Sequence, residues 1–274
     1  RWRFITNRQG FRDTKDYEYK KLPSEFRVIV LGDSHMQGFE VRQQHTLSAV
    51  LERILKKKGM ADQVLNTGIS GFSTAEQLAF IESEGIRYQP DAIVLGLFGN
   101  DFDDNIKSGL YQIVDGELKI VKTSHIPGVN LLDIHNAIPP LRWLSQNSHF
   151  YSLLFNTIWN FAKKLLLSSA EQKMKQEVSV SPDVTSIQQA KIELAKSIII
   201  RLKNAVNKVG ARLIIVDIPG RKNALEAKSS IPPVMRSFLK NKSDHLIRFD
   251  DALASYQGTT EFHVPHGQHH INEL

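Results

Sequence analysis

Short apolar runs along the chain alternate with segments whose apolar residues recur every three or four positions. The apolar runs, which predict buried strands, lie at 26–31, 63–65, 91–97, 212–216 and 245–249. The segments with helical spacing, 47–55 and 195–209, predict amphipathic helices that end near Gly59 and Gly210. The chain is therefore built from strands and helices in alternation.

This alternation predicts the fold class. Apolar strands that alternate with helices form a parallel sheet that is covered on both faces. Ser73 and Glu76 have the spacing of a capping box, which adds a helix after the second strand. We expect an α/β protein with a flavodoxin-like three-layer α/β/α sandwich and a central parallel sheet of about five strands. Its functional residues should follow the carboxyl ends of the strands.

Residues 104–185 interrupt the alternation. Within them Tyr151, Phe155, Ile158 and Phe161 recur at helical spacing. The interpretation is a single domain, residues 1–274, that carries a mostly helical, aromatic-rich insertion at about 104–185. The insertion could be a helix packed on the core, or a wall beside the functional site.

Composition narrows the class of protein and of partner. The 274 residues are 41% hydrophobic and 23% charged, as in soluble globular proteins. The chain has no cysteine, which excludes disulfides and thiol nucleophiles. The net charge is +6, but the basic residues are dispersed, so no nucleic-acid partner is expected.

Polar clusters follow the first three predicted strands, and a histidine-rich segment ends the chain. The clusters read Gly32-Asp33-Ser34, Asn66-Thr67-Gly68 and Asn100-Asp101, and the last segment contains His270. A serine hydroxyl becomes a good nucleophile when a histidine takes its proton. Acyl transfer also needs donors for the developing oxyanion, such as a glycine N–H and an asparagine amide. These residue types together favour serine-dependent acyl transfer.

The four motifs, in this order, resemble those of the SGNH/GDSL hydrolase superfamily. The resemblance implies that Ser34 is the nucleophile and His270 the general base. It also implies an oxyanion hole made of the Ser34 N–H, the Gly68 N–H and the Asn100 amide, with no cofactor. Asp33 and Asp101 are interpreted as caps of their turns.

The chain departs from the family pattern in two places. Phe98 stands where the family usually has a glycine, although Asn100 keeps its position. The family also places an aspartate two or three residues before the histidine, where this chain has Gln268 and Gly267. We therefore expect His270 to be oriented by a main-chain carbonyl or by a carboxylate from elsewhere. The nearest candidates along the chain are Glu261, Asp250 and Asp251.

Two alternatives concern the histidines. His269 could be the base in place of His270, although His270 is followed by Ile271 and Asn272, which resembles the His-x-Asn pattern of the family. His263, His266, His269 and His270 could instead bind a metal, because imidazole is a common zinc ligand. No neighbouring feature specifies a metal, so none is predicted.

The resemblance leads to a functional hypothesis. We expect a serine esterase that removes or transfers a small acyl group, with acetyl expected, on a carbohydrate. The alternatives are a lipase or thioesterase acting on longer acyl chains, and a glycan-binding module that has lost turnover. The segment from Asn7 to Arg12, which leads into Gly-Asp-Ser, looks like bacterial SGNH proteins of the cell envelope. The expected location is the envelope or periplasm, with a removed N-terminal segment as a potential membrane anchor.

Overall fold

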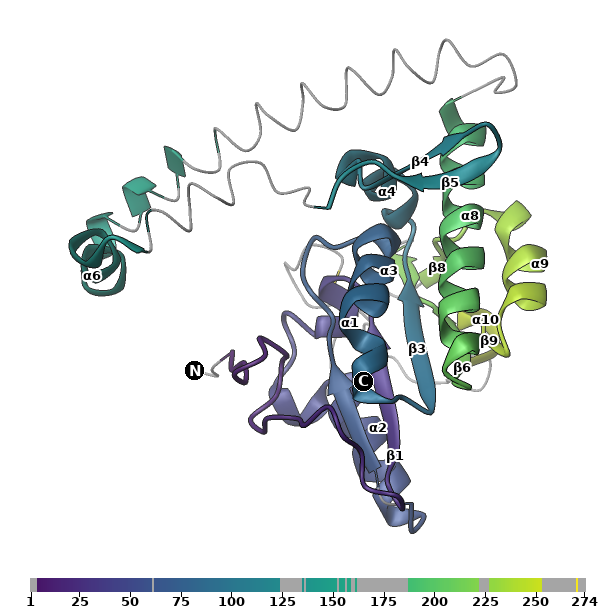
Figure 1. The fold of residues 1–274 in the computed structure, drawn as a ribbon, viewed down its shortest axis with the longest axis horizontal. Coiled ribbons are helices and arrows are strands. Elements are labelled where there is room, and N and C mark those ends of the chain that lie inside the picture. Colours follow the sequence, from purple (N-terminus) through teal and green to yellow (C-terminus); the bar gives the residue numbers. More distant parts are fainter. Residues whose placement is uncertain are drawn as a thin grey trace.

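The structure is a computed structural model, shown in Figure 1. It describes residues 4–60, 62–123, 135, 137–151, 153–155, 157–158, 161, 187–221, 227–252 and 270. The sheet in this part of the chain has five parallel strands: β1 (Phe26–Leu31), β2 (Asp62–Asn66), β3 (Ala92–Leu97), β6 (Arg212–Asp217) and β9 (His245–Ile247). Their order, β2-β1-β3-β6-β9, is that of a flavodoxin-like sheet. The predicted fold class is confirmed.

Helices cover both faces of the sheet, and the strand side chains alternate between two apolar clusters. Ile29 and Leu31 of β1 point into the larger cluster, whereas Val28 and Val30 point into the smaller one. Among the helices that pack on the larger cluster are α3 (Thr74–Ser83), α8 (Ile187–Lys208) and α9 (Pro233–Lys242). Helix α2 (Leu47–Lys57) packs on the smaller cluster through Leu51 and Leu55. The three layers follow from this period-two alternation.

The predicted helix ends agree with the structure. Helix α3 opens on the capping box, in which Ser73 accepts from the Ala75 N–H and Glu76 accepts from the Ser73 N–H. Gly210, just after α8, has a φ of 73°, in the left-handed region that favours glycine. Both helix ends therefore depend on residues close together in the chain, which is why they could be predicted from the sequence.

The structure adds a β-hairpin to the insertion expected at about 104–185. After helix α4 (Asp101–Ser108), strands β4 (Tyr111–Val114) and β5 (Glu117–Ile120) form an antiparallel hairpin. Asp115 and Gly116 at its turn have φ values of 53° and 76°, as a type I′ turn requires. Tyr111 is buried in the larger apolar cluster, so the hairpin belongs to the core.

The aromatic segment that follows is helical where the structure describes it. Helix α6 (Pro139–Asn147) lies away from the sheet in Figure 1. The side chains of Trp143, Phe150 and Phe161 are 62%, 76% and 66% exposed. These three side chains therefore belong to neither of the two apolar clusters of the described core.

The remaining described elements are short. They are α1 (Ser34–Gln37), η1 (Gln43–His45), η2 (Gly85–Tyr88), β7 (Pro219–Arg221), β8 (Ala227–Ser229) and α10 (Phe249–Ala252). None of the helices in the described ranges combines the length and the hydropathy that a membrane crossing requires.

Candidate active site

Three neighbouring strands bring the predicted motifs to one edge of the sheet. Strand β1 lies between β2 and β3, so the loops after these strands are adjacent. The loop after β2 is tied to the loop after β1, because the Ile69 N–H donates to the Gly32 carbonyl over 3.0 Å. Ser34, Gly68 and Asn100 each follow one of these strands. Their common edge is the one at which sites form in such sheets.

A tight turn carries Ser34 from strand β1 into helix α1. Gly32 packs so closely on this helix that an added Cβ would lie 2.3 Å from Cγ of Met36. Asp33 caps the helix by accepting the His35 N–H over 2.9 Å. Ser34 is the first helical residue, so its own N–H has no acceptor within the helix. The turn therefore presents the hydroxyl and this N–H at the same place.

His270 lies between Ser34 and Glu40. Its Nε2 is 2.8 Å from Oγ of Ser34, and its Nδ1 is 2.7 Å from Oε2 of Glu40. The side chains of His270 and Glu40 are only 12% and 28% exposed. With the proton on Nδ1 donated to Glu40, Nε2 is free to accept the proton of the Ser34 hydroxyl. The geometry is that of a Ser-His-carboxylate triad.

The carboxylate at His270 is not one that the sequence pointed to. Asp251 carries a 70% exposed side chain that pairs with Arg248 over 3.7 Å. The side chain of Asp250 and all of Glu261 lie outside the described residues, as does His269. The orienting group at Nδ1 is Glu40, and this corrects the three proposed candidates.

Glu40 was missed because no motif connects it to His270. The two residues are 230 positions apart in the chain, whereas the usual aspartate precedes the histidine by two or three. Glu40 lies in the loop after α1, where Gly38 turns the chain with a φ of 70°. The one available signal was its position six residues after Ser34, on the loop that follows the short helix carrying the nucleophile.

The donors proposed for the oxyanion hole follow β1, β2 and β3. Gly68 packs against helix α1, where an added Cβ would lie 2.5 Å from the Gln37 nitrogen. In this structure its N–H donates to Oδ1 of Asn66 over 3.2 Å, so a substrate would have to replace Asn66 as the acceptor. Asn100 donates one hydrogen of its amide to Asp104 over 2.9 Å. Because an amide nitrogen carries two hydrogens, the second is left to donate to a substrate.

Replacing Asn100 with alanine is expected to lower kcat by on the order of 10²–10³, or about 2.7–4 kcal/mol. The reason is the loss of a donor that acts where charge develops in the transition state. Turnover of a p-nitrophenyl ester by the folded variant measures the effect. Unchanged turnover would remove Asn100 from the mechanism.

A second imidazole lies beside the triad. Nδ1 of His35 is 3.0 Å from Oδ1 of Asp33, and the ring centroids of His35 and His270 are 5.1 Å apart. The ring of Phe98 lies 4.3 Å from that of His35. Burial raises the pKa of the Asp33 carboxyl, but the hydrogen bonds of His35 outweigh it and hold that pKa below its ordinary value. Asp33 thus fixes both the turn and the His35 ring.

Asp101 holds the loop after β3 from a fully buried position. Its Oδ2 accepts the Phe98 N–H over 2.8 Å, and its Oδ1 accepts the Thr74 hydroxyl over 3.3 Å. Burial, with the charge of Asp33 added, raises the pKa of Asp101 well above its ordinary value. The structure thus gives Asp101 the capping role expected for it.

The raised pKa of Asp101 predicts a pH-dependent stability. The folded state binds this proton more tightly than the unfolded state does. Its contribution is therefore complete below the unfolded pKa of about 3.9, and it is lost as the pH rises through the raised value. Asp101→Asn should flatten this decline, as measured by urea unfolding at several pH values between 4 and 8. Parallel curves for the two proteins would contradict the assignment.

The metal alternative finds no support in the described residues. Both ring nitrogens of His270 are engaged by Ser34 and Glu40. No group of three histidine, aspartate or glutamate side chains in the described ranges could hold an ion. His263, His266 and His269 lie outside those ranges.

Comparisons with known proteins give likenesses to solved structures. No protein-family model and no curated protein matches the chain. The esterase AlinE4 of the SGNH-hydrolase family is 15% identical, with a TM-score of 0.44 over 90% of this chain and 88% of its own. TesA is 14% identical, with a TM-score of 0.42 over 86% and 85%. A catalytic mutant of Axe2, an acetylxylan esterase from Geobacillus stearothermophilus, is 12% identical, with a TM-score of 0.39 over 86% and 83%. At these values the likeness carries no argument about the reaction.

Proposed function

We propose that this chain is a serine esterase of the SGNH/GDSL type. The observation that carries the proposal is the pair of hydrogen bonds from His270, one to Oγ of Ser34 and one to Glu40. A histidine placed between a hydroxyl and a carboxylate is the arrangement that activates a serine for attack on an ester. A degenerate binding module has no need of this alignment.

The mechanism uses the chain's own residues. Nε2 of His270 takes the proton from Oγ of Ser34 as the oxygen attacks the carbonyl carbon of the ester. The C–O bond to the alcohol then breaks, and Nε2 returns the proton to the departing oxygen. Water, or a sugar hydroxyl in a transfer reaction, then attacks the acyl-serine with His270 again acting as base. The products are the acid, or a new ester, and free Ser34.

Two groups of the protein stabilise the charges that develop. Glu40 lies 2.7 Å from Nδ1, where it fixes the tautomer and stabilises the imidazolium without accepting its proton. The oxyanion of the tetrahedral intermediate is received by the Ser34 N–H and the Asn100 amide, and by the Gly68 N–H once the oxyanion replaces Oδ1 of Asn66 as its acceptor. The oxyanion donors are those that the resemblance to the SGNH/GDSL superfamily implies, whereas the role of Glu40 is proposed from the structure.

The proposed substrate is a carbohydrate that carries a small acyl group, with acetyl as the first candidate. The support is the resemblance of the motifs, and of the segment from Asn7 to Arg12, to envelope enzymes of bacteria. We propose the same envelope or periplasmic location on that ground.

A second candidate is an esterase for longer acyl chains. A groove of about 840 Å³ lies on the α2 side of the sheet and reaches His35 and Met36, next to the nucleophile. Most of its lining is apolar, and it includes Val41, Leu51 and Val94. Such a surface would favour a long aliphatic chain over acetyl.

Two measurements test the proposals. A fluorophosphonate should label the protein covalently, and a protein that neither labels nor hydrolyses any ester would overturn the esterase assignment. p-Nitrophenyl acetate, butyrate and octanoate then separate the substrates. Fastest turnover of the acetate ester supports a small acyl group as the substrate. Fastest turnover of the octanoate ester supports the second candidate, in which a long acyl chain binds in the groove.

A further inference from the structure

We propose that Arg12 is a positioning residue for the triad, because its guanidinium holds the loop that carries Glu40. The inference rests on the proposed function, since it concerns the group that orients His270. Arg12 is the last residue of the segment from Asn7 to Arg12. The resemblance of this segment to bacterial proteins assigns no role to the arginine.

The guanidinium bonds the loop on both sides of Glu40. Arg12 is 1% exposed, and its Nη1 donates to the Gln37 carbonyl over 2.8 Å. Its Nη2 donates to the Val41 carbonyl, and its Nε donates to Oε1 of Gln43 over 3.2 Å. Glu40 lies between the two carbonyls, in a stretch that forms neither helix nor strand. The planar fork of arginine therefore fixes the separation of the two carbonyls that flank the catalytic carboxylate.

The loop is shaped to receive this side chain. At Gly38 an added Cβ would lie 3.0 Å from Nη1 of Arg12 and 2.9 Å from Cγ2 of Thr46. Gln43 also donates back from its amide to the Arg12 carbonyl over 3.0 Å. The ring of Phe4 covers the guanidinium, 4.6 Å from its carbon. The loop and the N-terminal segment therefore fit each other around one buried cation.

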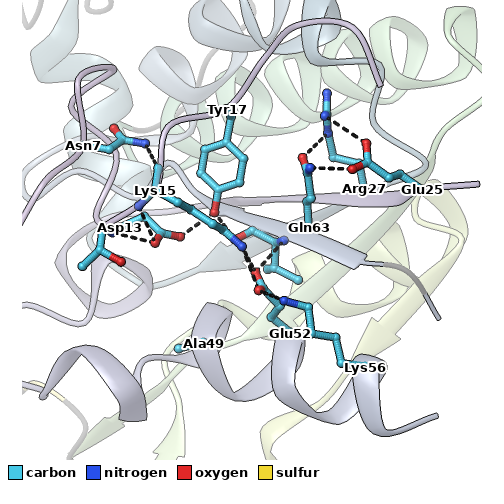
Figure 2. Close-up of polar contacts among 12 residues, drawn as sticks. Asn7, Asp13, Lys15, Tyr17, Glu25, Arg27, Ala49, Glu52, Lys56 and Gln63 are labelled. Atoms are coloured by element: carbon cyan, nitrogen blue, oxygen red, sulfur yellow. Dashed lines mark hydrogen bonds and ion pairs between the residues drawn. The ribbon is translucent and has the colours of Figure 1, made fainter. Parts of the chain in front are cut away.

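The N-terminal segment is itself fixed to the body of the protein. Figure 2 shows Lys15 reaching Glu52 of helix α2, with Nζ and Oε1 2.7 Å apart. The Tyr17 hydroxyl reaches the Val64 carbonyl of β2 over 3.3 Å. The Arg12 N–H donates to the Asn66 carbonyl over 3.2 Å. Arg12 therefore connects the loop that carries Glu40 to a segment that is fixed on β2 and α2.

Arg12 acts by position and not by neutralising Glu40. Its partners are three neutral oxygens, and in the described part of the chain no carboxylate lies within ion-pair distance of it. Burial lowers the pKa of the Arg12 guanidinium, yet arginine stays protonated in proteins. The carboxylate of Glu40 is therefore left to interact with His270.

The chain offers a matched control in Arg27. This arginine is also 1% exposed, and its Nε also donates to a glutamine Oε1, that of Gln63, over 3.0 Å. Its Nη1 bonds three main-chain carbonyls, those of Glu18, Tyr19 and Tyr88. It lies at the amino end of β1, the end away from Ser34. Removing either arginine should weaken folding, but only Arg12 should affect the chemistry.

The test compares Arg12→Gln, Arg12→Lys and Arg27→Gln in the full chain with p-nitrophenyl acetate. Turnover is counted per site labelled by a fluorophosphonate, so that misfolded protein does not contribute. Arg12→Gln should lower kcat roughly 10- to 100-fold with little change in KM, as expected when a catalytic group is misplaced. Arg12→Lys keeps the charge without the fork and should recover part of the loss. Arg27→Gln should lower Tm and leave kcat per site unchanged.

A double variant decides whether the effect passes through Glu40. If Arg12 acts by positioning that carboxylate, Arg12→Gln should add nothing to the loss caused by Glu40→Gln. Additive losses, or an Arg12→Gln enzyme with normal kcat per labelled site, would overturn the proposal. Should Arg12→Gln fail to fold, the same comparison is made with Arg12→Lys. A wild-type protein without any labelling or turnover would instead overturn the esterase assignment, so the two failures are distinguishable.

Discussion

Replacing Ser34 with alanine is expected to abolish fluorophosphonate labelling and to lower ester turnover by on the order of 10⁶-fold. The reason is geometric: the hydroxyl that lies 2.8 Å from Nε2 of His270 is the atom that forms the acyl-enzyme. Without it, the remaining donors can only polarise the ester toward water. Mass spectrometry of the labelled protein and initial rates with p-nitrophenyl acetate measure the two effects.

The control for this experiment is another serine of the chain. Ser83 is exposed on helix α3, and its hydroxyl bonds the Ala79 carbonyl within the same helix. Ser83→Ala should keep both labelling and turnover. The variant Ser34→Ala should keep the Tm of the wild type within a few degrees, because the Ser34 side chain is partly exposed and caps no element. A Ser34→Ala protein that is still labelled would show that another residue is the nucleophile.

Replacing Glu40 with glutamine should lower kcat by on the order of 10³–10⁴, approaching the loss seen when a serine protease exchanges its aspartate for asparagine. Glutamine has the size of glutamate but can donate to Nδ1, which would stabilise the wrong tautomer of His270. It also lacks the charge that stabilises the imidazolium. Single-turnover and steady-state rates with p-nitrophenyl acetate separate this loss from a change in binding.

Asp251 supplies the matched control for Glu40. It is one of the carboxylates nearest to His270 in sequence, but in the structure it pairs with Arg248 at the surface. Asp251→Asn is therefore expected to retain full turnover, whereas Glu40→Gln loses it. The reverse result would show that the carboxylate at Nδ1 during turnover is not Glu40.

Local patterns were enough to place most of the fold. Each strand of the sheet is an apolar run of a few residues, and each covering helix shows its apolar positions at the helical period. The capping box at Ser73 and the glycine after α8 are read from a few adjacent residues. The hairpin at 111–120 was missed, although Asp115-Gly116 is a strong hairpin signal, because the aromatic helical pattern further on was extended over it.

The sequence by itself determined the sheet and the positions of Ser34, Gly68 and Asn100 on it, because a strand end and the turn that follows are decided by neighbours in the chain. It also pointed to His270, by resemblance to a motif. Only the tertiary structure decided which carboxylate orients that histidine. Glu40 is far from His270 in the chain, and no local pattern records which loop will lie beside the imidazole. The same holds for Arg12. Its proposed positioning role depends on two main-chain carbonyls that lie beside its guanidinium only in the folded loop.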